Sequence, residues 1–265
     1  MSKIYAIANQ KGGVGKTTSV INLSAYLASN GRRVLMVDMD PQANATSGMG
    51  YDKYTLDAST YDLLLEEAPL DEVRLHQAEY KLDVLPSHPS LSGAEVELVN
   101  AIGREYRLRN MLEQVDGRYD YILIDCPPSL GLLTVNALTA AKDGILIPVQ
   151  CEYLALEGLT QLTQTIELVQ RYLNPNLHIR GLIMTMYDSR TNLSRQVVEE
   201  VRRYFPGQVF RSIIPRNVRL SEAPSYGQPI NFYAPTSPGA LAYKVLAAEL
   251  LQGDVPETAV SGVAI

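Results

Sequence analysis

Residues 7–23, "IANQKGGVGKTTSVINL", combine glycines, lysines and hydroxyl side chains at a spacing suited to binding phosphate. Lys16 can reach the β- and γ-phosphates of a nucleotide, and the Thr17 hydroxyl suits Mg²⁺. A helix predicted to begin near Lys16 adds the positive end of its dipole. The glycines let the backbone bend and turn its N–H groups towards phosphate oxygens; they are Gly12, Gly13 and Gly15. The stretch therefore predicts a nucleotide site.

The same stretch departs from the strict phosphate-loop pattern G-x-x-x-x-G-K-[ST]. Gln10 stands where the pattern has its first glycine, and Lys11 follows at a position open to any residue. A flexible ammonium beside the loop can neutralise charge that develops on a transferring phosphoryl group. The alternative is a glycine-rich turn that binds no ligand, in which case the run "GKTT" would be a coincidence.

Three carboxylates follow predicted strands. Asp38 and Asp40 lie in "VLMVDMDPQAN", and Asp125 ends "YILID". Ligands of open α/β sheets bind at the carboxyl ends of the strands. A carboxylate there can hold Mg²⁺ through water or orient an attacking water. Each aspartate alone could simply cap the next turn, but together with the phosphate loop they predict a metal–phosphate site.

The composition limits the class of protein. A chain of 265 residues can form one large domain or two small ones. No apolar run reaches the roughly 18 residues of a membrane span, and no signal-peptide pattern opens the chain. Two cysteines, Cys126 and Cys151, are too few for a disulfide framework, so we expect a reduced, cytoplasmic protein. The net charge of −6 by itself argues against nucleic-acid binding.

Apolar runs alternate with amphipathic segments along the chain. We expect helices over 15–30, 90–115 and 156–173. The alternation predicts an α/β fold with a mainly parallel sheet between helical layers. We expect one domain over residues 1–252 and a disordered tail over 253–265. The expected strands are 3–9, 32–38, 81–87, 119–125, 143–150, 178–186 and 208–215.

The charge is distributed unevenly. Residues 176–245 contain nine Lys or Arg against four acids, which gives this segment a net charge of +5. The whole chain has a net charge of −6, so the residues outside this segment have a net charge of −11. Such a segment indicates one cationic surface. No helix-turn-helix or zinc-finger spacing accompanies it, so sequence-specific DNA reading is not predicted. The alternative is a solvated surface with paired charges.

Three motifs resemble those of a known family. "KGGVGKTT", "VDMDPQAN" and "YILIDCPPSLG" are similar to the deviant Walker A, Walker A′ and Walker B motifs of the ParA/MinD ATPases. The resemblance continues through "PVQCEYLALEG", "IPRNVRLSEAPSYGQPI" and "PTSPGALAY", which look most like chromosomal ParA (Soj). It implies a P-loop NTPase sandwich whose members dimerise around two ATP molecules.

The resemblance also implies roles for individual residues. Lys11 is the signature lysine, which reaches the phosphates bound by the partner, while Lys16 binds phosphate in cis. Asp40 positions the hydrolytic water. Thr17 would ligate Mg²⁺, with Asp40 and Asp125 acting through water. Pro215 and Asn217 would border the adenine. The loop residues expected to contact ATP are Lys11, Gly12, Gly13, Val14, Gly15, Lys16, Thr17 and Thr18.

Partners are implied by the same family. Its ParA members bind double-stranded DNA nonspecifically as ATP-bound homodimers, which favours a role for the cationic segment. They act with a centromere-binding ParB-type protein and associate with the nucleoid, with no membrane partner. The candidate DNA contacts are Arg190, Arg195, Arg216 and Arg219, of which Arg190 and Arg219 rank highest.

Other functions were weighed against this one. A membrane-cycling MinD-type ATPase should end in a basic amphipathic helix, whereas "GDVPETAVSGVAI" is acidic and contains Pro. Asp40 and Lys11 argue against a nucleotide-gated scaffold with negligible hydrolysis. An ATPase that positions a plasmid or another cargo stays open, because the motifs do not separate cargo types. Cys126 suggests the iron–sulfur relatives of the family, but two small buried cysteines are the favoured interpretation.

Overall fold

The computed structural model describes residues 1–152 and 155–254, with the backbone alone over 155–158. An eight-stranded sheet lies at its centre, in the order β3-β4-β2-β5-β1-β6-β7-β8. Every neighbouring pair is parallel except β3 and β4, which confirms the mainly parallel sheet. The strands are β1 (Lys3–Ile7), β2 (Val34–Asp38), β3 (Leu75–Gln77), β4 (Leu82–Leu85), β5 (Tyr121–Asp125), β6 (Ile145–Gln150), β7 (Ile179–Tyr187) and β8 (Val209–Pro215).

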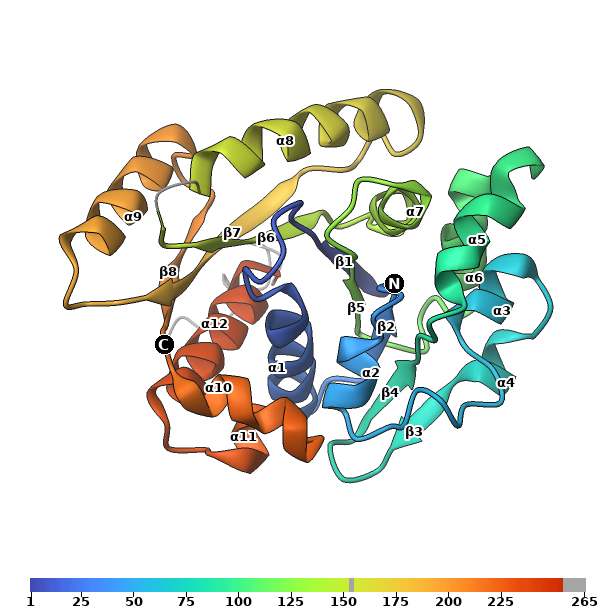
Figure 1. Ribbon diagram of the computed structural model, residues 1–265, viewed down its shortest axis with the longest axis horizontal. Helices are drawn as coiled ribbons and strands as arrows, with labels where there is room; N and C mark the ends of the chain where they lie inside the picture. Colours follow the sequence, from blue (N-terminus) through green and yellow to red (C-terminus); the bar gives the residue numbers. More distant parts are fainter. Residues whose placement is uncertain (153–154, 255–265) are drawn as a thin grey trace, which may run out of the picture.

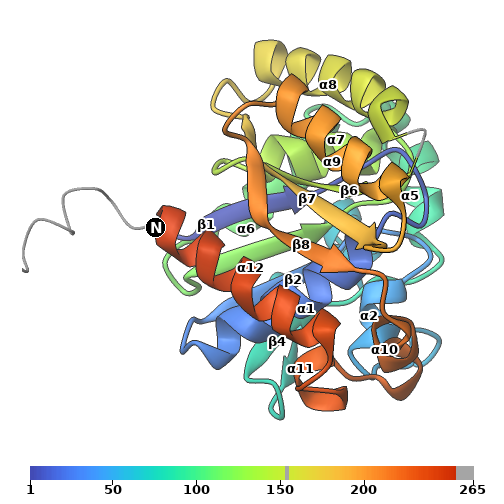
Figure 2. The ribbon, with the colours of Figure 1, turned by 90° about the vertical axis from the view of Figure 1, so that its left-hand side faces the viewer.

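Helices cover both faces of this sheet (Figures 1 and 2). The α-helices are α1 (Lys16–Ser29), α2 (Asn44–Gly48), α3 (Thr60–Leu65), α4 (Leu70–Val73), α5 (Leu91–Glu97), α6 (Arg107–Glu113), α7 (Leu132–Ala140), α8 (Ala155–Tyr172), α9 (Asn192–Tyr204), α10 (Val218–Glu222), α11 (Ile230–Tyr233) and α12 (Pro238–Asp254). Short 3₁₀ helices are η1 (Leu98–Asn100), η2 (Arg104–Tyr106) and η3 (Ala223–Tyr226). Among the helices of the described ranges, none combines the length and apolar character needed to span a membrane.

Two apolar cores result, one on each face of the sheet. Along β1, Ile4 and Ala6 point into the core shared with α5 to α9, whereas Tyr5 and Ile7 point into the core shared with α1 and α12. Successive strand residues face opposite sides, so a strand covered on both sides needs apolar residues throughout. This explains why the apolar runs of the sequence are continuous.

Two predictions about the elements were incomplete. The short strand β3 was not expected, because three residues with an exposed His76 carry no clear apolar pattern. The helical segment expected over 90–115 is interrupted between α5 and α6. Gly103 adopts a left-handed conformation there, with φ of 69°, and the neighbouring Ile102 is fully exposed. Apolar spacing alone did not reveal this break.

The last helix is held to the amino ends of the central strands. The Asp254 carboxylate accepts hydrogen bonds from the hydroxyls of Tyr5 (2.7 Å) and Tyr121 (3.0 Å). It also pairs with Arg180 at 3.2 Å, and its side chain is 6% exposed. The described helix thus continues two residues past the boundary expected at 252. The rest of the expected tail, 255–265, lies outside the described residues.

Replacing Asp254 with Ala should lower the free energy of unfolding by about 2–4 kcal/mol, because Arg180 and two buried hydroxyls would lose their common acceptor. Urea denaturation of the parent and the variant measures this difference. Glu113→Ala is the control, since it removes an exposed pair with Arg109 and should cost less than about 1 kcal/mol. Equal stability of Asp254→Ala and the parent would contradict a structural role for this cluster.

Candidate functional site

The three predicted motifs meet at the carboxyl edge of the sheet. Asp125 at the end of β5 is paired in register with Ile7 of β1 on one side and with Asp38 of β2 on the other. Backbone hydrogen bonds continue the register past the strand ends, from Met39 N to Asp125 O (3.0 Å) and from Cys126 N to Ile7 O (3.2 Å). The phosphate loop and both carboxylate segments therefore lie side by side, as expected from the sequence.

The loop between β1 and α1 has the backbone shape that its glycines allow. Gly13 and Gly15 have φ of 74° and 93°, a left-handed conformation that side chains disfavour. Gly15 directly precedes α1, and its carbonyl accepts the hydrogen bond from Ser19 N at 2.9 Å. The first turn of the helix therefore opens towards the loop, which is the arrangement that presents N–H groups to an anion.

Two side chains fasten this loop to neighbouring strands. The Asn9 amide donates to the carbonyl of Pro148 in β6 (2.7 Å) and accepts from Lys11 N (3.0 Å). The Thr185 hydroxyl of β7 donates to the carbonyl of Val14 (2.8 Å). Both side chains are buried. The loop shape is thus fixed by protein contacts, so the phosphate site is preorganised.

The two lysines of the loop have different surroundings. Lys16 is 6% exposed, and its Nζ donates to the Lys11 carbonyl at 3.3 Å. Burial lowers the pKa of Lys16, and the nearby charges of Asp125, Cys126 and Asp40 act in the opposite direction. Lys11 is partly exposed. The geometry thus gives Lys16 an inward role and leaves Lys11 at the surface.

Asp38 and Asp125 are both completely buried. Asp38 accepts hydrogen bonds from Asp40 N (3.1 Å), Thr46 N (2.8 Å) and the Thr46 hydroxyl (2.7 Å). Burial raises the pKa of Asp38 to about 6, although these hydrogen bonds favour the ionised form. Asp38 is therefore a satisfied, structural carboxylate.

Asp125 is the opposite case. Neither of its oxygens accepts a hydrogen bond of standard geometry from the described residues. Burial raises the pKa of Asp125 well above its usual range, as do the charges of Asp38 and Asp40, while the Thr17 hydroxyl and Lys16 act in the opposite direction. A buried carboxylate without a partner is costly, and a cation or its hydration water would relieve that cost. The residues present therefore fit a hydrated Mg²⁺.

Asp40 lies just beyond the end of β2 and is 6% exposed. Its Oδ1 accepts from Gln42 N at 2.9 Å, which leaves acceptor capacity on the carboxylate. Its backbone carbonyl accepts from the Ser87 hydroxyl at 2.8 Å. Within the described residues no three or more His, Cys, Asp or Glu side chains are arranged to hold a metal ion on their own. A metal here would depend on phosphate and water as additional ligands.

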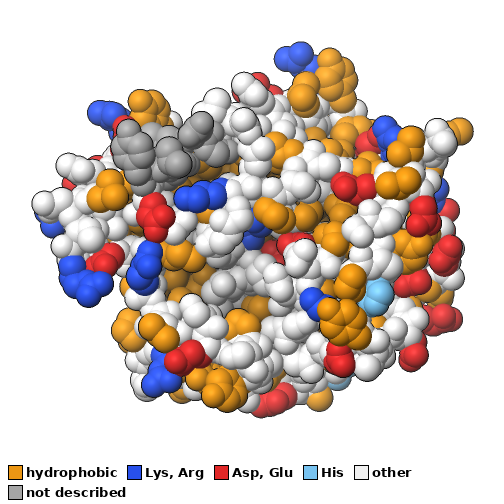
Figure 3. All heavy atoms as spheres, viewed as in Figure 1, with side chains coloured by type: hydrophobic (Ala, Val, Ile, Leu, Met, Phe, Trp, Pro, Cys, Tyr) orange, Lys and Arg blue, Asp and Glu red, His pale blue; other side chains and the backbone are white. Residues whose placement is uncertain are grey.

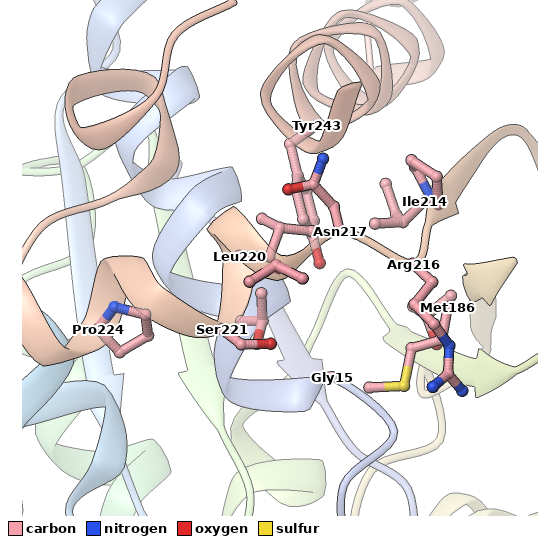
Figure 4. A pocket seen from close by; sticks show the side chains of 13 residues that line it. Gly15, Met186, Ile214, Arg216, Asn217, Leu220, Ser221, Pro224 and Tyr243 are labelled. Atoms are coloured by element: carbon pink, nitrogen blue, oxygen red, sulfur yellow. The ribbon is translucent and has the colours of Figure 1, made fainter. Parts of the chain in front are cut away.

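A cavity of about 380 Å³ adjoins the start of α1 (Figure 4). Its lining includes Gly15 and Thr18 on one side, with Pro215 at the end of β8 and Asn217 just after it on the other. Figure 4 shows Asn217 and Tyr243 among the side chains that line this pocket. Both residues expected to border adenine thus line a mainly apolar cavity next to the phosphate loop. Such a space suits a flat aromatic base.

The four arginine candidates lie near the carboxyl ends of β7 and β8. Three form ion pairs: Arg190 with Asp188 (2.7 Å), Arg216 with Glu152 (3.0 Å) and Arg219 with Glu222 (2.8 Å). Arg195 on α9 is exposed, and none of the ion pairs in the described part of the chain includes it. In Figure 3 several Lys and Arg side chains lie on the side of α9 and α10, with acids among them, and acids predominate along the opposite edge.

Both cysteines are buried and neither forms a disulfide. Burial raises the pKa of the Cys126 thiol, and the charge of Asp125 adds to this effect. It likewise raises the pKa of the Cys151 thiol to about 12. Both shifts favour the protonated thiol, as is typical of cysteines buried in apolar surroundings.

Some residues of the site were not identified from the sequence. Asn9 and Thr185 hold the phosphate loop, and each is a polar residue at the end of an apolar strand, a signal that could have been used. Tyr243 lines the cavity from α12 and meets the Ser19 hydroxyl at 3.0 Å. No local pattern marks this tyrosine, because its contact spans more than 220 residues.

Comparison with known proteins agrees with this geometry. A family model described as an AAA domain matches residues 2–179. The chromosome partitioning protein ParA of Myxococcus xanthus is 56% identical over 97% of this chain and 91% of its own length. The sporulation initiation inhibitor protein Soj of Bacillus subtilis is 57% identical over 94% and 98%, respectively.

A solved structure shares the fold over nearly the whole length. Cobyrinic acid a,c-diamide synthase from Mycobacterium smegmatis, with bound ATP analogue and magnesium, has a TM-score of 0.84 and 40% identity, covering 95% of each chain. The phosphate loop, the aligned carboxylates and these similarities lead to one assignment. The chain belongs to the ParA/MinD family of P-loop ATPases, together with ParA and Soj.

Proposed function

We propose that this protein is a DNA-partitioning ATPase that dimerises around ATP, binds DNA nonspecifically and acts with a ParB-type partner. The observation that carries the nucleotide part is the buried Asp125, which accepts no hydrogen bond of standard geometry from the described residues and lies beside Lys16 and the preorganised loop. The partitioning part rests on the similarity to ParA and Soj over more than nine-tenths of this chain.

ATP and Mg²⁺ are the ligands that fit the site. The loop N–H groups and Lys16 would hold the phosphates, and the cavity beside Asn217 would take the base. Thr17 would hold Mg²⁺ directly, with Asp40 and Asp125 acting through water. The ion would neutralise phosphate charge and relieve the buried Asp125. The solved relative from M. smegmatis binds an ATP analogue with magnesium, which supports this proposal.

Hydrolysis would be divided between two subunits. Asp40 has free acceptor capacity and would orient the attacking water above its own nucleotide. Lys11 starts from a partly exposed position and would reach the phosphates of the partner subunit, where its charge stabilises the transition state. A monomer would lack that ammonium, so hydrolysis would be slow until the dimer forms.

DNA would bind the basic surface over α9 and α10. Phosphate contacts give affinity without base recognition, and a dimer presents the surface twice. Ion pairing with Asp188, Glu152 and Glu222 reduces the effective charge of three candidates. Among the residues that the structure describes, none forms an ion pair with Arg195, so Arg195 is the strongest single candidate.

The names of the relatives point to two different functions, amide synthesis and chromosome partitioning. The diamide synthase is 40% identical to this chain, whereas the two partitioning proteins are 56% and 57% identical. The higher similarity favours partitioning, with the chromosome as cargo and a plasmid as the alternative. Phosphate release stimulated jointly by DNA and a ParB-type protein tests this choice, since amide synthesis would not depend on either.

Asp40→Ala should bind ATP with an affinity within about threefold of the parent, yet lower kcat for hydrolysis by about 100-fold or more, since the water is no longer positioned. The ATP-bound dimer should consequently accumulate. Phosphate release and light scattering after size exclusion measure the two effects. Asp71→Ala, at an exposed ion pair with Arg118, serves as the control. Parental hydrolysis by Asp40→Ala would disprove this role.

Lys11→Ala should bind ATP but hydrolyse it about 100-fold or more slowly, even with DNA and the partner protein present, because the transition-state charge loses its ammonium. Steady-state phosphate release and equilibrium nucleotide binding separate these effects. Lys142→Ala removes a lysine paired with Asp116 elsewhere on the surface and should be neutral. If Lys11→Ala loses ATP binding rather than turnover, the lysine acts on its own nucleotide site.

Arg195→Ala and Arg219→Ala should each weaken DNA binding in the ATP state. Each should also reduce the slope of log K for DNA binding against log salt concentration by about one, because one fewer counterion is released. Nucleotide affinity should not change. Fluorescence anisotropy with unrelated duplexes at several salt concentrations measures both quantities. The matched control is Arg109→Ala, an exposed arginine paired with Glu113 in the acidic part of the chain. An unchanged salt slope for both test variants would argue against this surface.

A further inference from the structure

The segment that carries Asp40 is fixed from one side by Asp38. Asp38 Oδ1 accepts from Asp40 N at 3.1 Å, and its Oδ2 accepts from both the backbone N (2.8 Å) and the hydroxyl (2.7 Å) of Thr46. Thr46 lies in α2, six residues after Asp40. The two ends of the segment 40–46 are therefore joined through one buried carboxylate.

The same segment is fixed from the other side by Ser87, which follows β4. Ser87 N donates to the Thr46 hydroxyl at 2.8 Å, and the Ser87 hydroxyl donates to the Asp40 carbonyl at 2.8 Å. The hydrogen bonds thus close a ring through Asp38, Thr46, Ser87 and Asp40. The first three are completely buried.

The ring leaves the Thr46 hydroxyl little freedom. It must donate to Asp38 and accept from Ser87 at once, so its rotation is defined. Hydrogen bonds in a buried network are stronger than in water, and an interrupted one leaves costly unpaired groups. The segment it holds is bent, since Ala43 has φ of 52°. A non-glycine residue keeps this conformation only where its surroundings determine it.

We propose that Thr46 and Ser87 are positioning residues that hold Asp40 where it can orient the attacking water. This inference rests on the proposed role of Asp40 in ATP hydrolysis. Neither hydroxyl touches the nucleotide site itself; each acts through the backbone of Asp40 or through Asp38. Small displacements of an orienting group have large effects on rate, whereas nucleotide binding depends on the separate loop 9–18.

The experiment compares Thr46→Val, Thr46→Ser and Ser87→Ala with the parent. Thr46→Val keeps the shape but removes the hydroxyl, and kcat should fall about 10-fold or more while KM for ATP stays within about threefold. Thr46→Ser restores the hydroxyl and should keep kcat within about threefold of the parent. Ser87→Ala removes the bond to the Asp40 carbonyl and should lower kcat about three- to tenfold.

Thr139→Val is the matched control for loss of a buried threonine hydroxyl. That hydroxyl donates to the Val135 carbonyl in its own helix at 2.7 Å and has no part in the ring. The kcat of Thr139→Val for ATP hydrolysis should equal that of the parent. Thermal midpoints of all variants are recorded, so that assays run where each protein is folded. If Thr46→Val does not fold, the test is the kcat of Ser87→Ala compared with that of Thr46→Ser, and the inference then requires a lower kcat in Ser87→Ala.

Two results would overturn the inference. One is parental kcat in folded Thr46→Val and Ser87→Ala. The other is a loss of kcat in Thr139→Val that matches the loss in Thr46→Val, which would indicate a general effect of stability. Asp40→Ala, measured alongside, separates this failure from that of the proposed function. If Asp40→Ala is inactive while the ring variants are normal, only the positioning inference fails.

Discussion

Two buried carboxylates lie directly opposite each other where β2 and β5 end, and much of the site follows from this juxtaposition. Asp38 and Asp125 are register partners, and like charges in such positions destabilise a sheet. Burial raises the pKa of both carboxyl groups. The protein satisfies Asp38 with three hydrogen bonds, whereas Asp125 accepts none of standard geometry from the described residues. The charge of Lys16 favours the ionised form of Asp125, and under the proposed function a bound cation would favour it further.

The rest of the carboxyl edge serves this arrangement. β1 lies beside β5 and delivers the glycine loop next to Asp125, and α1 turns Lys16 inward. Asn9 ties the loop to β6 and Thr185 holds it from β7, while the ring around Asp38 holds Asp40. The site is thus stiff where it would bind phosphate and metal. Lys11 is partly exposed, whereas Lys16, Asp38, Asp40 and Asp125 are buried, which suits a group proposed to act on another subunit.

Much of this could be predicted from the sequence, for identifiable reasons. Strands buried on both faces must be apolar throughout, so seven of them stood out, whereas the three-residue β3 did not. The glycine loop and the aspartates are local patterns fixed to strand ends. By contrast, the contact of Tyr243 with Ser19 and the pairing of Arg216 with Glu152 join distant segments. The ring through Thr46 and Ser87 is likewise tertiary, and its members are ordinary hydroxyl residues in the sequence.

In the proposed dimer switch Lys11 acts on the nucleotide of the partner subunit, and mixing two inactive variants tests this role most directly. Subunits carrying Lys11→Ala and Asp40→Ala are combined in equal amounts before ATP is added. In a mixed dimer, the Lys11→Ala subunit keeps its own Asp40 and receives Lys11 from its partner. Random pairing in a two-fold dimer should then restore about a quarter of the parental rate. A mixture no more active than either variant alone would show that Lys11 serves its own nucleotide, and the dimer switch would be wrong.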